Sequence, residues 1–198
     1  MRYQEEHRTR SRQRIIEMAA RRYQAEGIGA VGIANLMADL GMTHGGFYRH
    51  FADKEALVAE TCRLSFKAVE QHWQPWLVPG AGSRRALVED FLAHHPDFSS
   101  FASTLAGEIS RRDHISRRAF TEGVHGWLAQ LETTQGQGGP DDLKPAALLA
   151  LMLGAQLLTR VISDPNLAQR IAADVAALTA ARIVAQQQDG GDAQVATP

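Results

Sequence analysis

The sequence has little of several features, and each shortage excludes a class of protein. A single cysteine, Cys62, excludes an internal disulfide framework and fits a reducing cytoplasm. No run approaches the roughly 18 apolar residues of a membrane span, and the first residues contain no apolar signal-peptide region. Aromatic residues are 7% of the chain, and Val, Ile and Thr form no alternating runs that would favour strands. We therefore expect an all-α, cytoplasmic protein.

Net charge is also small, but it is unevenly distributed. The formal net charge is −1. Residues 1–54 hold nine Lys or Arg against six Asp or Glu, which gives +3, and the remaining twelve bases and sixteen acids give −4. A basic N-terminal segment followed by an acidic remainder is typical of a protein that binds a polyanion through its N-terminal part. An excess of three charges also arises easily by chance, so the pattern is only supporting evidence.

Apolar spacing predicts three helices near the N-terminus, over residues 9–26, 33–40 and 43–51. Gly27 and Gly41 are placed to end the first two helices, and Thr43 is placed to cap the third. Such short helices separated by glycine-containing turns are the pattern of a helix-turn-helix unit. Asp53 is expected to cap a fourth helix, which would begin at Lys54 and reach about residue 76.

Further helical segments are predicted near residues 83–94, 98–111, 115–132, 143–163 and 165–187. The sequence thus divides into a helix-turn-helix domain at 1–54, a helical body at 55–188 and a polar tail at 189–198 that we expect to be disordered.

The third predicted helix has an unusual solvent face. At 100° per residue, Phe47 and Phe51 share the core side, while Gly45, Gly46 and Arg49 lie opposite. Two interior glycines cost roughly 2 kcal/mol relative to alanine. Close approach to another surface, such as a DNA groove, would offset that cost. The alternative is that the glycines form a loop beside an ordinary polar surface.

The segment from about Arg10 to Leu64 resembles the N-terminal domain of TetR/AcrR-type repressors. The match rests on Gly41-Met42-Thr43-His44-Gly45-Gly46-Phe47-Tyr48-Arg49-His50-Phe51 and on Lys54-Glu55-Ala56-Leu57. The resemblance implies contacts with operator DNA from Thr43, His44, Gly45, Gly46, Tyr48, Arg49, His50 and Lys54. His44 stands where the family often has Lys, so we expect one phosphate contact to be weaker or pH-dependent. Gly32 and Ala34 also depart from the family pattern, so we expect fewer contacts from the second helix and more from the basic arm of Arg8, Arg10, Arg12 and Arg14.

The resemblance also implies a C-terminal domain for ligand binding and dimerisation. Dimer-interface candidates share faces of the last two helices, and they are Leu148, Met152, Ala155, Ile171, Val175 and Leu178. Ligand-pocket candidates are Trp73, Phe101, Glu108, Phe120, His125, Trp127 and Gln156. The expected function is therefore a dimeric repressor that binds a palindromic operator and is released by a small-molecule effector.

Two other interpretations remain open at this point. Glu122 and His125 form one Glu-x-x-His pair, but a di-metal helical bundle needs two such pairs and further carboxylates. We therefore expect no metal, no cofactor and no enzyme activity. Cys62 is interpreted as a buried small apolar residue, with a redox sensor as the alternative.

Overall fold

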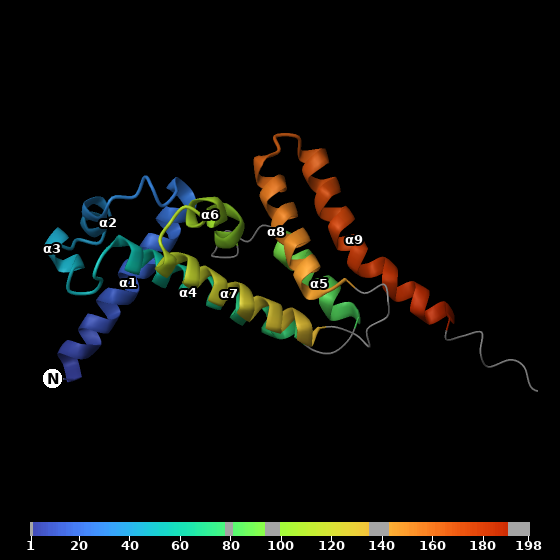
Figure 1. The fold of residues 1–198 in the computed structure, drawn as a ribbon, viewed down its shortest axis with the longest axis horizontal. Coiled ribbons are helices and arrows are strands. Elements are labelled where there is room, and N and C mark those ends of the chain that lie inside the picture. The colour runs from blue at the N-terminus through green and yellow to red at the C-terminus, as the bar shows by residue number, and fades with distance from the viewer. Residues whose placement is uncertain (1, 78–80, 94–99, 135–142, 190–198) are drawn as a thin grey trace, which may run out of the picture. The chain divides into compact units, whose positions relative to one another are not determined.

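The computed structural model describes residues 2–77, 81–93, 100–134 and 143–189, and within these ranges it is helical without strands (Figure 1). The elements are α1 (Arg2–Glu26), α2 (Ile33–Asp39), α3 (His44–Phe47), α4 (Lys54–Trp73), the 3-10 helix η1 (Gln74–Trp76), α5 (Ala81–Leu92), α6 (Phe101–Ile109), α7 (His114–Thr133), α8 (Pro145–Val161) and α9 (Pro165–Asp189). The all-α prediction is confirmed.

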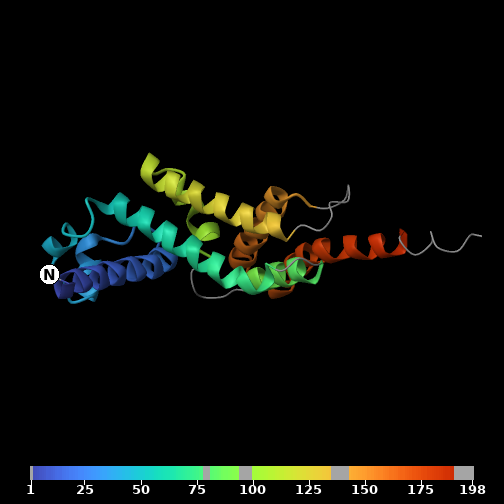
Figure 2. The ribbon, with the colours of Figure 1, turned by 90° about the horizontal axis from the view of Figure 1, so that it is seen from below.

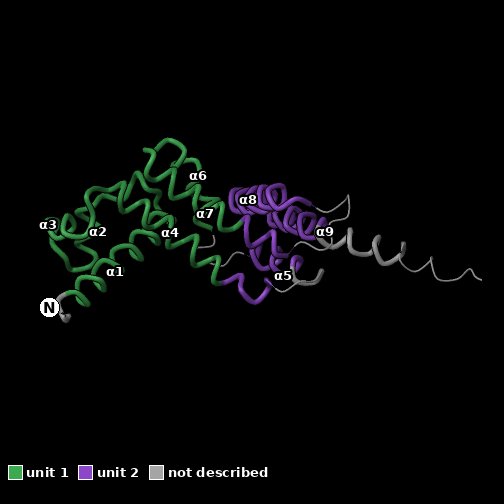
Figure 3. The backbone as a smooth tube through the Cα atoms, turned by 60° about the horizontal axis from the view of Figure 1, so that its bottom comes forward, with its two compact units in different colours: residues 1–71, 95–127 green, residues 72–94, 128–198 purple. Residues whose placement is uncertain are grey.

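The chain forms two compact units (Figure 3). Unit 1 comprises residues 1–71 and 95–127, and unit 2 comprises residues 72–94 and 128–198. This division follows compactness alone, so the functional boundary expected at residue 54 stays a prediction. The tail beyond residue 189 and the glycine-rich segment 135–142 lie outside the described residues.

The core of unit 1 is built from the apolar positions that the helical spacing selects. Ile15, Ala19 and Tyr23 of α1 are almost fully buried, as are Leu36 of α2 and Phe47 of α3. They form one cluster that continues into α4, α6 and α7 through side chains such as those at positions 57, 58, 105 and 119. Burial of one face of each short helix supplies the stability that four or seven residues of helix lack by themselves.

The turns of unit 1 follow the predicted chemistry. Gly27 and Gly41 have φ values of 83° and 67°, a region that favours glycine. The Thr43 hydroxyl accepts a hydrogen bond from the Gly46 amide at 3.3 Å. Asp53 accepts one from the Ala56 amide at 2.8 Å. Both predicted N-caps are therefore confirmed.

Two helix boundaries differ from the prediction. Helix α1 begins at Arg2 rather than near residue 9, so the basic arm is helical. Helix α3 spans only four residues, and Tyr48, Arg49 and His50 lie in a turn after it. The His50 amide bonds the Phe47 carbonyl at 2.8 Å, an i to i+3 contact that tightens the chain. The two glycines have low helix propensity, which explains why α3 is shorter than predicted.

Helices α4 and α7 lie side by side in unit 1 (Figures 1 and 2). The indole N–H of Trp127 donates to the Phe66 carbonyl at 3.1 Å, and their rings are 4.5 Å apart. A Cβ atom added at Gly123 would lie 2.1 Å from the Phe66 ring. Glycine at position 123 is thus what allows the two helices to approach so closely.

Unit 2 contains η1, α5, α8 and α9, together with the ends of α4 and α7. Helix α9 packs against both α8 and α5. Trp73 and Phe91 meet edge to face with ring centroids 5.9 Å apart. The Gln156 side chain is buried, and its amide donates a hydrogen bond to the Phe91 carbonyl at 3.2 Å, which offsets the cost of burying a polar group.

Candidate nucleic-acid interface

The α3 segment places its apolar side chains inward and its polar side chains outward. Phe47 is fully buried and stacks on Phe51 at 5.4 Å. Tyr48 is 56% exposed although it is aromatic, and its ring meets the exposed His44 ring at 5.6 Å. The unusual exposure of a large aromatic ring beside hydrogen-bonding groups is typical of a binding surface.

Gly45 and Gly46 have different surroundings. A Cβ atom at Gly46 would lie 3.3 Å from the Thr43 hydroxyl that caps the helix, so glycine there has a reason inside the chain. A Cβ atom at Gly45 would meet nothing within 4 Å. The helix therefore has no packing need for glycine at position 45, and its open backbone is available to an external surface.

Two cations flank this surface without a bonding partner in the described part of the chain. Arg49 is exposed, and its side chain makes no hydrogen bond or ion pair there. Lys54, at the start of α4, is half-buried and is equally unpaired. Burial and the positive charge of Arg112 lower the pKa of Lys54. A nearby anion would remove this electrostatic cost.

His50 is the third polar group of the turn. Its Nδ1 atom is shielded from solvent and has no hydrogen-bond partner among the described residues. Burial, followed by the charges of Arg8, Arg12 and Arg49, lowers the pKa of His50. An imidazole surrounded by cations favours its neutral form until an anion approaches.

An open hollow of about 650 Å³ lies between α1 and the α3 segment. It is lined by His7, Arg8, Ser11, Met37, Met42, Thr43, Gly46, Arg49 and His50. The guanidinium of Arg8 donates to the Arg49 carbonyl at 3.1 Å, so α1 is tied directly to the turn. Sequence reasoning missed His7 and Ser11 because it began the first helix at residue 9, which left His7 outside the helix. Their i, i+4 spacing becomes a signal once the helix starts at residue 2.

The four arginines of the basic arm have different surroundings. Arg12 forms an ion pair with Glu60 at 3.2 Å and lies over the Phe51 ring at 4.9 Å. Its charge is therefore used within the protein. Arg10 and Arg14 are exposed and do not line the hollow, whereas Arg8 does. Only Arg8 combines a fixed position with an accessible charge.

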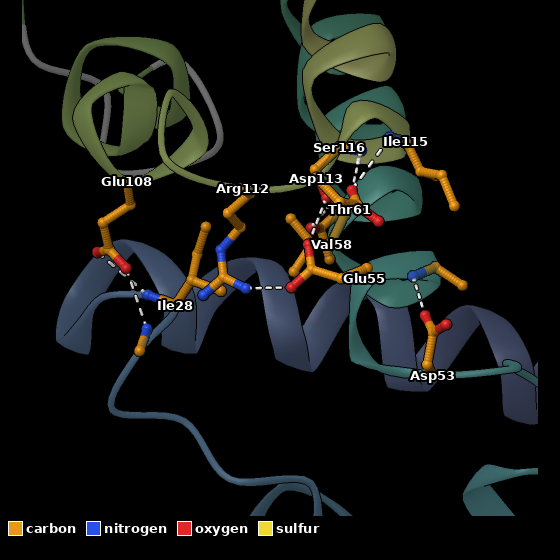
Figure 4. Close-up of polar contacts among 12 residues, drawn as sticks. Ile28, Asp53, Glu55, Val58, Thr61, Glu108, Arg112, Asp113, Ile115 and Ser116 are labelled. Atoms are coloured by element: carbon orange, nitrogen blue, oxygen red, sulfur yellow. Dashed lines mark hydrogen bonds and ion pairs between the residues drawn. The ribbon is translucent and has the colours of Figure 1, made fainter.

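A second polar cluster joins the helix-turn-helix elements to α6 and α7 (Figure 4). Glu108 of α6 accepts hydrogen bonds from the Ile28 and Gly29 amides at 3.2 and 3.0 Å. Glu55 of α4 binds the Arg112 guanidinium and accepts a 2.8 Å bond from the Ser116 hydroxyl. The two carboxylates thereby attach the α1–α2 loop and the start of α4 to the segment 108–116.

Figure 4 also shows how this segment begins α7. Asp113 accepts hydrogen bonds from the Ile115 and Ser116 amides, both at 3.0 Å, and so caps the helix. Residues of this cluster line a smaller hollow of about 430 Å³, and these are Glu55, Glu108, Arg111, Arg112 and Asp113. The sequence offered no signal for the cluster, because Glu55 lies more than fifty positions from the other four residues.

The ligand-pocket candidates are distributed over both units. Phe101 and Trp127 of unit 1 are buried, Phe120 is half-buried and His125 is exposed. Glu108 of unit 1 is engaged by the loop amides described above. Trp73 and Gln156 are buried in unit 2. Their role in ligand binding stays a prediction.

The dimer candidates differ in their accessibility. Leu148, Met152 and Ala155 of α8 are buried within the single chain. On α9, Ile171 and Val175 are half-buried and Leu178 is 44% exposed. Large apolar side chains that remain exposed on α8 are those of Leu157, Leu158 and Val161.

The metal and redox alternatives gain no support from the described residues. Glu122 is bound by Arg118 at 2.9 Å and Arg63 at 3.5 Å. No three potential ligands among His, Cys, Asp and Glu come together in the part of the chain that the structure describes. Cys62 is fully buried, and burial raises the pKa of its thiol to about 12, which keeps it protonated.

In the described ranges, every helix is too short or too polar to cross a lipid bilayer.

Residues 15–61 match the family model of bacterial regulatory proteins, tetR family. The comparison with curated proteins gives no significant match.

Several solved structures share the fold. The reduced form of NemR from E. coli is 20% identical, with 83% of this chain and 94% of that chain covered at a TM-score of 0.70. A TetR regulator from Chloroflexus aurantiacus is also 20% identical, covering 89% and 96% at 0.70. AibR, solved with isovaleryl coenzyme A and operator DNA, is 16% identical, covering 83% and 95% at 0.60. Residues 15–61 thus match the tetR family model of bacterial regulatory proteins, and the chain shares the fold of solved TetR/AcrR regulators.

Proposed function

We propose that the protein is a ligand-responsive transcriptional repressor that binds a palindromic operator as a homodimer. The observation that carries this proposal is the α3 surface, where Gly45 is open and Tyr48 and Arg49 are exposed. In the described chain, the Tyr48 ring packs against His44 and Phe47, but no hydrogen bond or ion pair engages the side chains of Tyr48 and Arg49. Hydrogen-bonding side chains around an unobstructed helix face fit a DNA groove and its phosphates.

Each contact has a distinct chemical role in this proposal. Arg49 can donate to guanine edges or to a phosphate, and Tyr48 and Lys54 can donate to phosphates. Thr43, His44, Gly45, Gly46 and His50 complete the contact surface. Phosphate contacts position the protein, whereas the base-edge contact supplies sequence preference.

The dimer follows from the size of the reading element. A helix of this length reads only a half-site, and two half-sites about 34–36 Å apart supply the affinity. Within unit 2, the exposed Leu157, Leu158 and Val161 of α8 and Leu178 of α9 supply apolar surface for a second subunit. Since Leu148, Met152 and Ala155 are already buried, they would support that surface from behind.

We further propose that a small molecule bound in the C-terminal helices releases the operator. AibR provides a precedent, because its crystal structure holds both isovaleryl coenzyme A and operator DNA. In this chain, the Glu55 and Glu108 contacts would transmit a shift of α6 or α7 to the α1–α2 loop and to α4. A DNA regulator of this kind would act in the cytoplasm.

The test is fluorescence anisotropy with a palindromic duplex that the full-length protein selects from a random-sequence pool. We expect Tyr48→Ala and Lys54→Ala to weaken binding to every sequence. Lys54→Ala should also flatten the salt dependence by about 0.9 in slope, because its charge neutralises a phosphate, whereas Tyr48 is uncharged. Arg49→Ala should change sequence preference by about 1–3 kcal/mol per protomer.

A matched control is Arg111→Ala, because Arg111 is an exposed cation outside the α3 surface. Its operator affinity should equal that of the wild type. Unchanged affinity in the Tyr48, Arg49 and Lys54 variants would refute the proposed interface. Elution as a monomer at micromolar concentration would refute the dimer. Small molecules that raise the melting temperature and also release the duplex would identify effectors.

A further inference from the structure

The hollow between α1 and the α3 segment contains basic and hydroxyl groups but no acid. Its lining includes two arginines, two histidines, Ser11 and Thr43, with Met37 and Met42 as the apolar part. None of the nine lining residues is Asp or Glu. An open site with several hydrogen-bond donors and unopposed positive charge is suited to an oxyanion.

Arg8 is held in this hollow by a contact that leaves its charge uncompensated. One of its N–H groups donates to the Arg49 carbonyl, a neutral acceptor. Its other N–H groups have no hydrogen-bond partner among the described residues. Arg12, one turn away, differs because Glu60 neutralises it at 3.2 Å. Guanidinium geometry favours two-point contact with phosphate oxygens, so the free edge of Arg8 is the natural donor.

His50 supplies a second indication from the opposite wall. Its Nδ1 atom is shielded from solvent and has no hydrogen-bond partner among the described residues, which is unfavourable for a buried polar group. The charged groups that act on it, Arg8, Arg12 and Arg49, are all positive. An anion between Arg8 and His50 would relieve the charge repulsion and also provide the missing hydrogen-bond acceptor.

We propose that the first turns of α1 form part of the DNA interface, with Arg8 and His50 holding one backbone phosphate of the duplex in this hollow. The inference rests on the proposed function, since it extends the α3 surface to a second element. The bond between Arg8 and the Arg49 carbonyl then positions the turn that carries Arg49. The bound group is a phosphodiester of DNA rather than free phosphate, because the hollow is open and adjoins the α3 surface.

Arg8→Gln is the central variant, because glutamine keeps an N–H donor for the Arg49 carbonyl and removes the charge. Arg8→Lys keeps the charge. Arg21→Gln is the matched control, since Arg21 is also exposed on α1 but lies about 20 Å farther along the helix, at 1.5 Å per residue. Anisotropy is measured on the full-length protein with the selected palindrome and with a random duplex, over a series of salt concentrations.

We expect Arg8→Gln to weaken binding to both duplexes, on the order of tenfold, and to flatten the salt slope by about 0.9 for each lost phosphate contact. Arg8→Lys should retain the wild-type slope, and Arg21→Gln should match the wild type. The proposal is overturned if Arg8→Gln keeps the wild-type slope. It is also overturned if Arg8→Lys flattens the slope as much as Arg8→Gln does, because the positive charge at position 8 would then contribute nothing to binding.

Failure of the operator-binding proposal and failure of the Arg8–His50 phosphate contact give different results. If the wild type binds both duplexes equally, specific operator recognition fails, but the random duplex still tests Arg8, because a phosphate contact carries no sequence information. Absence of binding to either duplex overturns both proposals. Titration with inorganic phosphate alone, followed by the His50 ring NMR signals, should show no saturable shift. A saturable millimolar shift would assign the hollow to a free anion and overturn the proposal.

Discussion

The two polar regions of unit 1 use their hydrogen-bonding groups in opposite ways. At the junction with α6 and α7, Glu55, Glu108 and Asp113 are satisfied by groups of the same chain. On the α3 surface, Tyr48 and Arg49 face outward without such partners in the described residues. Polar side chains therefore hold the fold together at the junction, whereas those of the α3 surface remain available to a partner.

This contrast predicts that stability and DNA binding separate by region. The largest effect on stability is expected for Glu55→Ala. Its removal leaves the Arg112 guanidinium, 18% exposed, without its carboxylate and removes the acceptor of Ser116. We expect a loss of about 2 kcal/mol in the free energy of unfolding, measured by urea denaturation.

Glu60→Ala on the same helix is the control, since its ion pairs with Arg12 and Arg63 are more exposed and worth less than about 1 kcal/mol. Tyr48→Ala should change stability by less than about 0.5 kcal/mol. If Glu55→Ala were no more destabilising than Glu60→Ala, the contacts at the junction with α6 and α7 would not be what stabilises the fold.

The two glycines of α3 give a sharper test of the same contrast. Gly45→Ala meets open space, so it should leave the protein unchanged or stabilise it by up to about 1 kcal/mol. Gly46→Ala must displace the capping hydroxyl of Thr43, so it should increase the free energy of unfolding by less than Gly45→Ala does. Both should weaken operator binding, because a methyl group separates the helix from DNA. Thermal denaturation and anisotropy on the same samples check this; full operator affinity in Gly45→Ala would remove the case for close backbone approach.

The pH dependence provides a third test. Because the folded-state pKa of His50 lies below its ordinary value of 6.5, the unfolded chain binds more protons near pH 6. His50 therefore contributes stability above about pH 6.5 that is lost as pH falls through its folded pKa. Operator affinity should change in the opposite direction and rise as pH falls, since a phosphate favours the imidazolium.

Melting curves and anisotropy between pH 5.5 and 7.5 measure the two trends. His50→Gln should flatten both, whereas His125→Asn, an exposed position on α7, should leave both as in the wild type. If stability and affinity changed in the same direction with pH, an anion could not be the partner of His50.

The smallest effect concerns the cap of α2. Gly32 has extended backbone with φ −82° and ψ 144° and provides no side-chain cap, and a Cβ atom added there would meet nothing within 4 Å. Gly32→Thr should stabilise the protein by a few tenths of a kcal/mol and should raise operator affinity, since the hydroxyl can reach a phosphate. Gly32→Ala lacks the hydroxyl and serves as the control. Equal affinity in the two variants would limit DNA contacts to α3 and α1.

The amino-acid sequence alone determined the helical class, the caps at Thr43 and Asp53 and the left-handed glycines at positions 27 and 41. These features depend on neighbouring residues, so local chemistry is sufficient to predict them. It also identified Phe47 as core, because helical periodicity places buried residues on one face.

Only the tertiary structure decided which charges are free. Arg8 and Arg12 look alike in the sequence, yet one lines an open hollow and the other pairs with Glu60, 48 positions away. Likewise, Glu55 and Arg112 meet only after folding. A charge is available to a partner only when the chain leaves it unpaired, and that depends on contacts distant in sequence.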